Sequence, residues 1–202
     1  MNILNNLKSN FGLVEPIMEQ QILDLGYTKE DIEDTLEENV FEKVDLGIPE
    51  FDFGNVYVLP EYVDLLEEYV NTVSEQDFIL KYFTGNNFEY GYFSGLCVMN
   101  VIHLSEQMFM EKVIYSIRTN KELYFNIGCM RIKVLPILSD YNQSNAFNIM
   151  LAFALNNYIE FFDYCWKDEF RKLKDASLIN ANILLMIKEL KILNEARDIF
   201  AQ

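Results

Sequence analysis

The spacing of apolar residues changes once within the first 60 residues, and this change constrains the fold more than any other feature of the chain. Up to Asn39, apolar residues recur every three or four positions, which predicts three helices. After Asn39 the pattern favours two short strands joined by a loop that contains Gly and Pro. Three helices followed by a hairpin is the element order of a winged helix-turn-helix domain. The expected helices cover residues 4–11, 14–25 and 28–39, with the helix-turn-helix core at 16–39 and the wing at 41–59.

The remainder of the chain predicts a helical linker and a second domain with both strands and helices. Apolar residues keep a helical spacing from Pro60 to Tyr82, so residues 61–84 are expected to form a helical linker. Strand patterns follow at 112–118 and in a hairpin that turns at Gly128-Cys129. The predicted fold class is therefore α+β. The chain is expected to consist of an acidic winged-helix-like domain over residues 1–60, the linker over 61–84, and a mixed α+β domain over 85–202. The last domain is expected to end in long helices near 143–165 and 176–200.

Net charge is distributed unevenly along the chain. The 202 residues carry a formal net charge of −16, with a pI near 4.4. Residues 1–80 hold 19 Asp and Glu and three Lys, whereas residues 81–202 hold 13 acidic and 13 basic residues. All the net charge therefore lies in the first two fifths of the chain, which argues against a general nucleic-acid binder and predicts a strong negative field on the first domain. An acidic surface that only keeps the protein soluble is the alternative interpretation.

The chain lacks the residue patterns of catalytic, metal and cofactor sites. His103 is the only histidine, and its apolar neighbours favour a core position. The chain has three cysteines, Cys97, Cys129 and Cys165. They contain no CxxC pair, and an odd number cannot all form disulfides with one another, so they are typical of reduced thiols in a cytoplasmic protein. Cys97 is expected to be a packing residue, although a helix N-terminus nearby could lower its pKa. We therefore expect no enzyme activity, no metal and no cofactor. The absence of a signal peptide or a long apolar stretch predicts no membrane association.

Residues 28–39 would supply the recognition helix of a winged helix domain. Thr28-Lys29-Glu30-Asp31 is a capping box with Asp in the place of Glu or Gln, so the helix is expected to begin after Thr28. A recognition helix normally lies in the major groove, flanked by Lys and Arg that contact phosphates. This helix instead has one lysine and six carboxylates, which DNA would repel: Glu30, Asp31, Glu33, Asp34, Glu37 and Glu38.

Short segments of the chain, taken in order, are similar to one family of proteins. The expected winged helix ends in Val56-Tyr57-Val58-Leu59-Pro60, and Gly91-Tyr92-Phe93-Ser94-Gly95-Leu96 follows it. Thr119-Asn120-Lys121 and the turn Phe125-Asn126-Ile127-Gly128 then lead into Arg131-Ile132-Lys133-Val134-Leu135. Over residues 10 to 160, this order resembles the AbiEi-type antitoxins of type IV toxin–antitoxin systems. The resemblance implies a protein without enzyme activity, with a winged helix that represses its own operon and a C-terminal domain needed for antitoxicity against a nucleotidyltransferase-like toxin.

The surface charge departs from the family's pattern. Besides the acidic helix, the second half has few basic residues around its strands, namely Lys112, Arg118, Lys121, Arg131 and Lys133. One hypothesis is a non-catalytic inhibitor whose carboxylates replace phosphates, as in acidic anti-CRISPR and anti-restriction proteins. Its partner would be a basic nucleic-acid-binding protein, either a toxin or a phage-defence nuclease.

The alternative hypothesis is a type IV antitoxin that represses its own operon as a DNA-binding dimer. Lys8, Lys29 and Lys43, or a basic surface of the second half, would then contact phosphates. The sequence leaves open the identity of the partner and whether the chain forms a homodimer. Two aromatic residues in the acidic loop are expected to anchor a partner, since exposed aromatic side chains anchor interfaces. The predicted partner-binding residues are Glu30, Asp31, Glu33, Asp34, Glu37, Glu38, Glu42, Asp45, Phe51 and Phe53.

Overall fold

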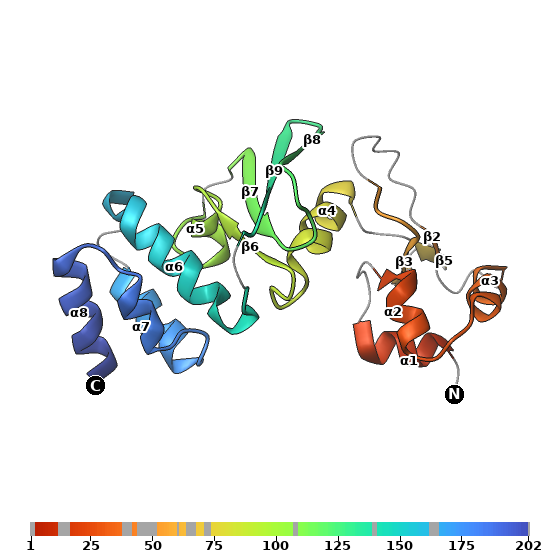
Figure 1. Cartoon of the computed structure of the whole chain (residues 1–202), viewed down its shortest axis with the longest axis horizontal. Coiled ribbons are helices and arrows are strands. Elements are labelled where there is room, and N and C mark those ends of the chain that lie inside the picture. Colours follow the sequence, from red (N-terminus) through yellow and green to blue (C-terminus); the bar gives the residue numbers. More distant parts are fainter. Residues whose placement is uncertain are drawn as a thin grey trace. The chain divides into compact units, whose positions relative to one another are not determined.

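The computed structural model divides the chain into two compact units, residues 1–82 and 83–202 (Figure 1). Each unit contains helices and strands, so the predicted α+β class is confirmed. None of the described helices is long and apolar enough to cross a membrane. The structure describes residues 3–11, 17–37, 42–43, 52–59, 61–63, 68–70, 74–106, 109–138, 141–161 and 166–201.

The first unit combines three helices with a small antiparallel sheet. The sheet has the order β1-β3-β2, so its last strand along the chain lies between the other two. Tyr57 in the central strand is opposite Ile17 on one side and Lys43 on the other. Helical side chains, including Leu7 and Ile32, form one buried core with this strand. The elements are α1 (Ile3–Phe11), β1 (Ile17–Met18), α2 (Glu19–Asp24), α3 (Lys29–Glu37), β2 (Glu42–Lys43) and β3 (Val56–Val58).

The second predicted helix begins later than its periodicity indicates. Ile17 and Met18 form strand β1 and pair with β3, and α2 begins only at Glu19. Residues 14–16 of the predicted helix lie outside the described residues. Pairing with β3 buries the Ile17 side chain completely, and a β-branched side chain packs well on a pleated strand. Tertiary packing therefore outweighs the helical spacing at these two positions.

The predicted helical linker contains strands as well as a helix. β4 (Glu61–Val63) pairs antiparallel with β5 (Glu68–Val70), and the helix α4 covers only Glu75–Thr84. The linker prediction is therefore wrong for these two strands, where Tyr and Val favour extended backbone. The helix begins after Ser74, whose Oγ accepts a hydrogen bond from the Asp77 amide at 3.1 Å and donates one to its carboxylate at 2.8 Å. These hydrogen bonds are the capping signal that fixes the start of α4.

The second unit is built on a four-stranded sheet with the order β6-β7-β9-β8. β7 and β9 are parallel, whereas the outer pairs, β6 with β7 and β8 with β9, are antiparallel. The predicted hairpin is confirmed, and it turns at Gly128 and Cys129 between β8 and β9. The strands are β6 (Gly91–Ser94), β7 (Glu111–Ser116), β8 (Leu123–Ile127) and β9 (Met130–Pro136).

The two faces of this sheet differ in burial. Ile114, Ile132 and Val134 are fully buried on one face. On the same face the Phe125 ring packs against Phe83, with ring centroids 5.8 Å apart. The opposite face is more open, and Tyr124 on the edge strand β8 is exposed there.

Short helices rather than long ones complete the second unit, so the predicted helices at 143–165 and 176–200 are wrong in length. In the range of the first, the α-helix α6 ends at Asn157, with one 3₁₀ turn before it (η1) and one after it (η2), and residues 162–165 lie outside the described residues. The second is interrupted where Ser177 adopts a left-handed backbone (φ 58°) and where the Asn180 side chain caps a new turn by accepting from the Asn182 amide. The helical elements are α5 (Val98–Val101), η1 (Gln143–Asn145), α6 (Ala146–Asn157), η2 (Ile159–Phe161), α7 (Trp166–Asp175), η3 (Ala181–Leu185) and α8 (Leu190–Ala201).

Helices α6, α7 and α8 share one apolar core, and α6 lies against β6 (Figure 1). Trp166 and Phe170 of α7 are almost fully buried in it, with ring centroids 5.9 Å apart. Cys165, directly before this helix, lies outside the described residues.

Candidate functional site

The candidate site is the outward face of α3 in the first unit, and its geometry begins with the helix cap. The predicted capping box is present: the Asp31 amide donates to Thr28 Oγ1 at 3.1 Å, and the Thr28 amide donates to the Asp31 carboxylate at 2.7 Å. The hydrogen bonds that the Thr28 amide and the Thr28 hydroxyl donate to the Asp31 carboxylate hold the pKa of this carboxyl below its usual value. Asp31 therefore stabilises the helix start, and its charge is partly engaged within the chain.

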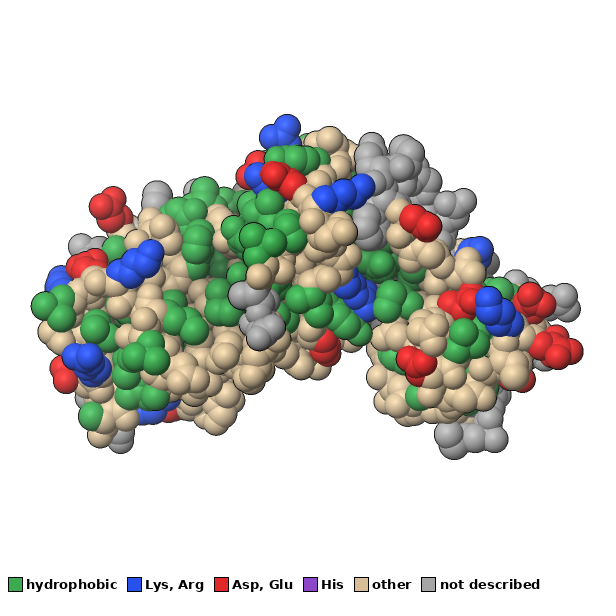
Figure 2. All heavy atoms as spheres, in the orientation of Figure 1, with side chains coloured by type: hydrophobic (Ala, Val, Ile, Leu, Met, Phe, Trp, Pro, Cys, Tyr) green, Lys and Arg blue, Asp and Glu red, His purple; other side chains and the backbone are tan. Residues whose placement is uncertain are grey.

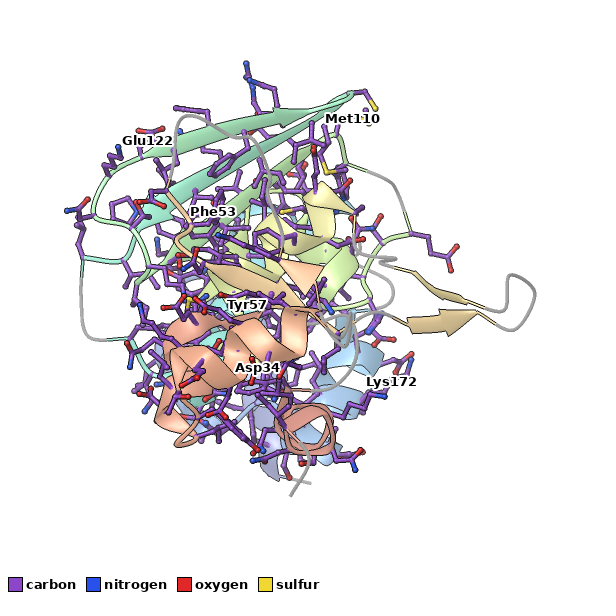
Figure 3. The ribbon with its side chains drawn as sticks, turned by 90° about the vertical axis from the view of Figure 1, so that its right-hand side faces the viewer. Asp34, Phe53, Tyr57, Met110, Glu122 and Lys172 are labelled. Atoms are coloured by element: carbon purple, nitrogen blue, oxygen red, sulfur yellow. The ribbon has the colours of Figure 1, made fainter. Side chains whose placement is uncertain are left out.

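The buried face of α3 fixes which side chains point outward. Ile32 and Thr35 are buried, and Ile32 belongs to the core of the first unit. At 3.6 residues per turn, the positions on the opposite side are Glu30, Glu33 and Asp34. All three are exposed, and within the described part of the chain none of their carboxylates has an ion-pair or hydrogen-bond partner. Figure 2 shows acidic side chains gathered over α2 and α3, and Figure 3 labels Asp34.

The single lysine of α3 is engaged by a carboxylate from another helix. Lys29 Nζ lies 3.0 Å from Glu19 of α2. Glu19 also accepts hydrogen bonds from the Asn55 side-chain amide and from the Tyr57 hydroxyl, the latter at 3.3 Å. The hydrogen bond from Asn55, followed by the interactions with Lys29, lowers the pKa of Glu19. Because Glu19 neutralises Lys29, the outward face of α3 keeps its negative charge.

Tyr57 connects this network to the sheet (Figure 3). Its side chain is buried, and burial is the main cause that raises its pKa to about 12. The negative charges of Glu19 and Glu33 act in the same direction. The hydroxyl therefore stays protonated and can donate to Glu19, which ties α2 to β3.

The other predicted partner-binding residues are less well supported. Phe53 was expected to be an exposed aromatic side chain of the acidic loop, but it is partly buried. Its ring lies edge-to-face on Phe78 and Tyr82 of α4, with centroids 5.6 and 4.8 Å away, so it packs within the first unit. Glu37 is the last residue of α3 and Glu42 begins β2, but their side chains are not among those described. Glu38, Asp45 and Phe51 lie outside the described residues.

The residues considered for chemistry take structural roles or lie at the surface. His103 is exposed, with a left-handed backbone (φ 58°), so the expected core position is wrong. Cys97 is buried, as expected, and its thiol donates to the Ser94 carbonyl at 2.9 Å. Burial raises the pKa of Cys97, so the considered lowering by a helix N-terminus is wrong. Among the described residues, no group of three His, Cys, Asp or Glu side chains is placed to hold a metal ion.

Sequence reasoning did not single out Glu19, the residue at the centre of this network. Its partners lie 10, 36 and 38 residues further along the chain: Lys29 on α3, Asn55 directly before β3, and Tyr57 on β3. Local sequence patterns report contacts within one helix or between adjacent strands. Only the folded arrangement brings Glu19 to Lys29, Asn55 and Tyr57.

Comparison with known proteins does not assign the chain to a family. No family model matches it, and no curated protein matches it either. The resemblance of the ordered segments to AbiEi-type antitoxins therefore stays an expectation from the sequence.

Proposed function

We propose that this chain is a non-catalytic inhibitory protein whose acidic first unit binds a basic, nucleic-acid-handling protein. The observation that carries this proposal is the outward face of α3. There Glu30, Glu33 and Asp34 are exposed without a cationic partner among the described residues. Lys29, the one base on the helix, is engaged by Glu19.

The order of elements supports a winged helix as the scaffold of this surface. The first unit runs α1, β1, α2, α3, β2, β3, with the final strand in the middle of the sheet. Apart from the short strand β1, this is the order of three helices and a hairpin expected of a winged helix-turn-helix domain, in which α3 would correspond to the recognition helix. Carboxylates would then occupy the surface that such a domain normally presents to DNA.

Electrostatics favours a basic protein over DNA as the partner of that surface. B-DNA carries one phosphate charge per about 1.7 Å of helix axis, and binding gains its free energy from basic side chains that displace counterions. Unpaired carboxylates on α3 would instead add repulsion. A groove lined by Lys and Arg on a nucleic-acid-handling protein is complementary to them, and such complementarity raises the association rate and selects the partner.

The resemblance to AbiEi-type antitoxins narrows the class of partner. It favours a cytoplasmic protein whose partner is a toxin. The negative surface adds phage-defence nucleases to the candidate partners, by analogy with acidic anti-CRISPR proteins. In either case the chain would act by occupying a nucleic-acid-binding groove, without catalysis.

A charge-reversal experiment tests this proposal. The triple variant E30K/E33K/D34K raises the net charge from −16 to −10 and leaves the buried face of α3 unchanged. Tagged wild-type chain is used to capture proteins from an extract of its own source cells. We expect it to retain a basic nucleic-acid-binding protein and to inhibit that protein's activity on nucleic acid, and we expect the triple variant to do neither.

A matched control separates the α3 surface from net charge alone. The variant D175K/E189K/D198K reverses three exposed carboxylates of the second unit and changes the net charge equally. It should capture and inhibit like the wild type. Circular dichroism verifies that both variants are folded. Full inhibition by a folded E30K/E33K/D34K variant would contradict the proposal.

The same element order also supports the alternative function, a type IV antitoxin that represses its own operon. A dimeric winged helix would then read the upstream DNA, with Lys8, Lys43 and the bases of the second unit contacting phosphates. Lys43 is exposed on β2, at the start of the expected wing. Specific binding to upstream DNA that weakens steeply with salt would favour this alternative.

A further inference from the structure

We draw no further inference here: the strongest candidate, the open face of the four-stranded sheet around Tyr124 and Lys133, carries nothing because Lys133 and Arg131 already pair with Glu122 and Glu111 and nothing in the structure shows what covers it.

Discussion

Gly91 shows how one residue without a side chain fixes the start of the sheet in the second unit. A Cβ at this position would lie 2.2 Å from the Tyr115 carbonyl oxygen and 2.6 Å from that of Phe83. Both are backbone atoms, so no side-chain rotation relieves the contact. The buried Ser116 hydroxyl lies in the same junction, 2.7 Å from the Phe83 carbonyl oxygen. Close packing of backbone, and not a special φ, therefore requires glycine here.

The variant Gly91→Ala should destabilise the second unit by about 1–3 kcal/mol, because overpacking at a rigid contact forces the backbone to move. Urea unfolding followed by tryptophan fluorescence measures this effect, since Trp166 is the single tryptophan and lies in the core of this unit. Asn126→Ala, at an exposed position of β8, is the control and should unfold like the wild type. An unchanged urea midpoint for Gly91→Ala would contradict close backbone packing between Gly91 and the Tyr115 and Phe83 carbonyl groups.

Glu19 gives the first unit a pH dependence whose sign follows from its hydrogen bonds. Its pKa in the folded protein is lowered from an ordinary value of 4.5. Because the pKa is lower in the folded protein, ionised Glu19 contributes its full stabilisation above the ordinary pKa of 4.5. This stabilisation is lost as the pH falls through the lower pKa of the folded protein. Glu19→Gln should therefore be less stable than the wild type at pH 7, and the difference should shrink below pH 4.5. Thermal midpoints at several pH values measure it; a difference independent of pH would contradict this role.

At the scale of elements, two asparagines of α6 hold the segment between α7 and α8. The side-chain oxygen of Asn148 (Oδ1) accepts a hydrogen bond from the backbone amide of Asn180 at 3.0 Å. The side-chain NH₂ group of Asn148 donates to the side-chain oxygen of Asn180 at 3.1 Å. Asn156, two turns later, accepts from the Lys188 amide and donates to the Met186 carbonyl, both at 2.9 Å. These contacts replace the regular hydrogen bonds that an irregular segment lacks.

Asn148→Ala should destabilise the second unit by about 1–2 kcal/mol, because it leaves the Asn180 amide without its acceptor. Hydrogen exchange should then become faster in the segment around η3, whose position depends on this contact. Asn157→Ala provides the control, since Asn157 is exposed and its side chain bonds only within its own helix. Equal exchange in the two variants would contradict the proposed role of Asn148.

Elements with a strong local signal could be predicted from the sequence. The Thr28–Asp31 box located the start of α3, and alternation with a Gly-Cys turn located the β8–β9 hairpin. Strands that are defined mainly by pairing with another strand could not be predicted. Strand β1 pairs with β3, and β4 pairs with β5. Each of β1, β4 and β5 is only two or three residues long, and the spacing of apolar residues around them resembles that of a helix.

The candidate site could be predicted only in part. The spacing of Glu30, Glu33 and Asp34 already placed them on one side of α3, because Ile32 and Leu36 define the buried side. The engagement of Lys29 by Glu19 and the packing of Phe53 on α4 required the fold. Both contacts join residues that are not neighbours in the sequence, and both bear on the predicted partner-binding surface. Because Glu19 neutralises Lys29, the outward face of α3 is more negative than the sequence alone indicates. Because the Phe53 ring packs on α4, this residue is less exposed than a partner anchor was expected to be.

In the whole molecule, charge is divided unevenly between the two parts of the chain. Residues 1–80 hold all of the net charge of −16, whereas residues 81–202 are neutral. On the proposed function, the first unit is a winged-helix scaffold that would bind DNA if its outward face were basic. Its carboxylates would therefore be the reason that it engages a protein instead.

A gel shift on the chain's own upstream DNA, at about 50 and 200 mM salt, shows whether the first unit binds DNA. The wild type should retard the DNA at neither salt concentration. The E30K/E33K/D34K variant should gain retardation at about 50 mM and lose it at about 200 mM, because lysines would then contact phosphates. Specific retardation by the wild type would contradict the proposed function, and weaker retardation by the triple variant would then mean that the acidic helix itself binds DNA.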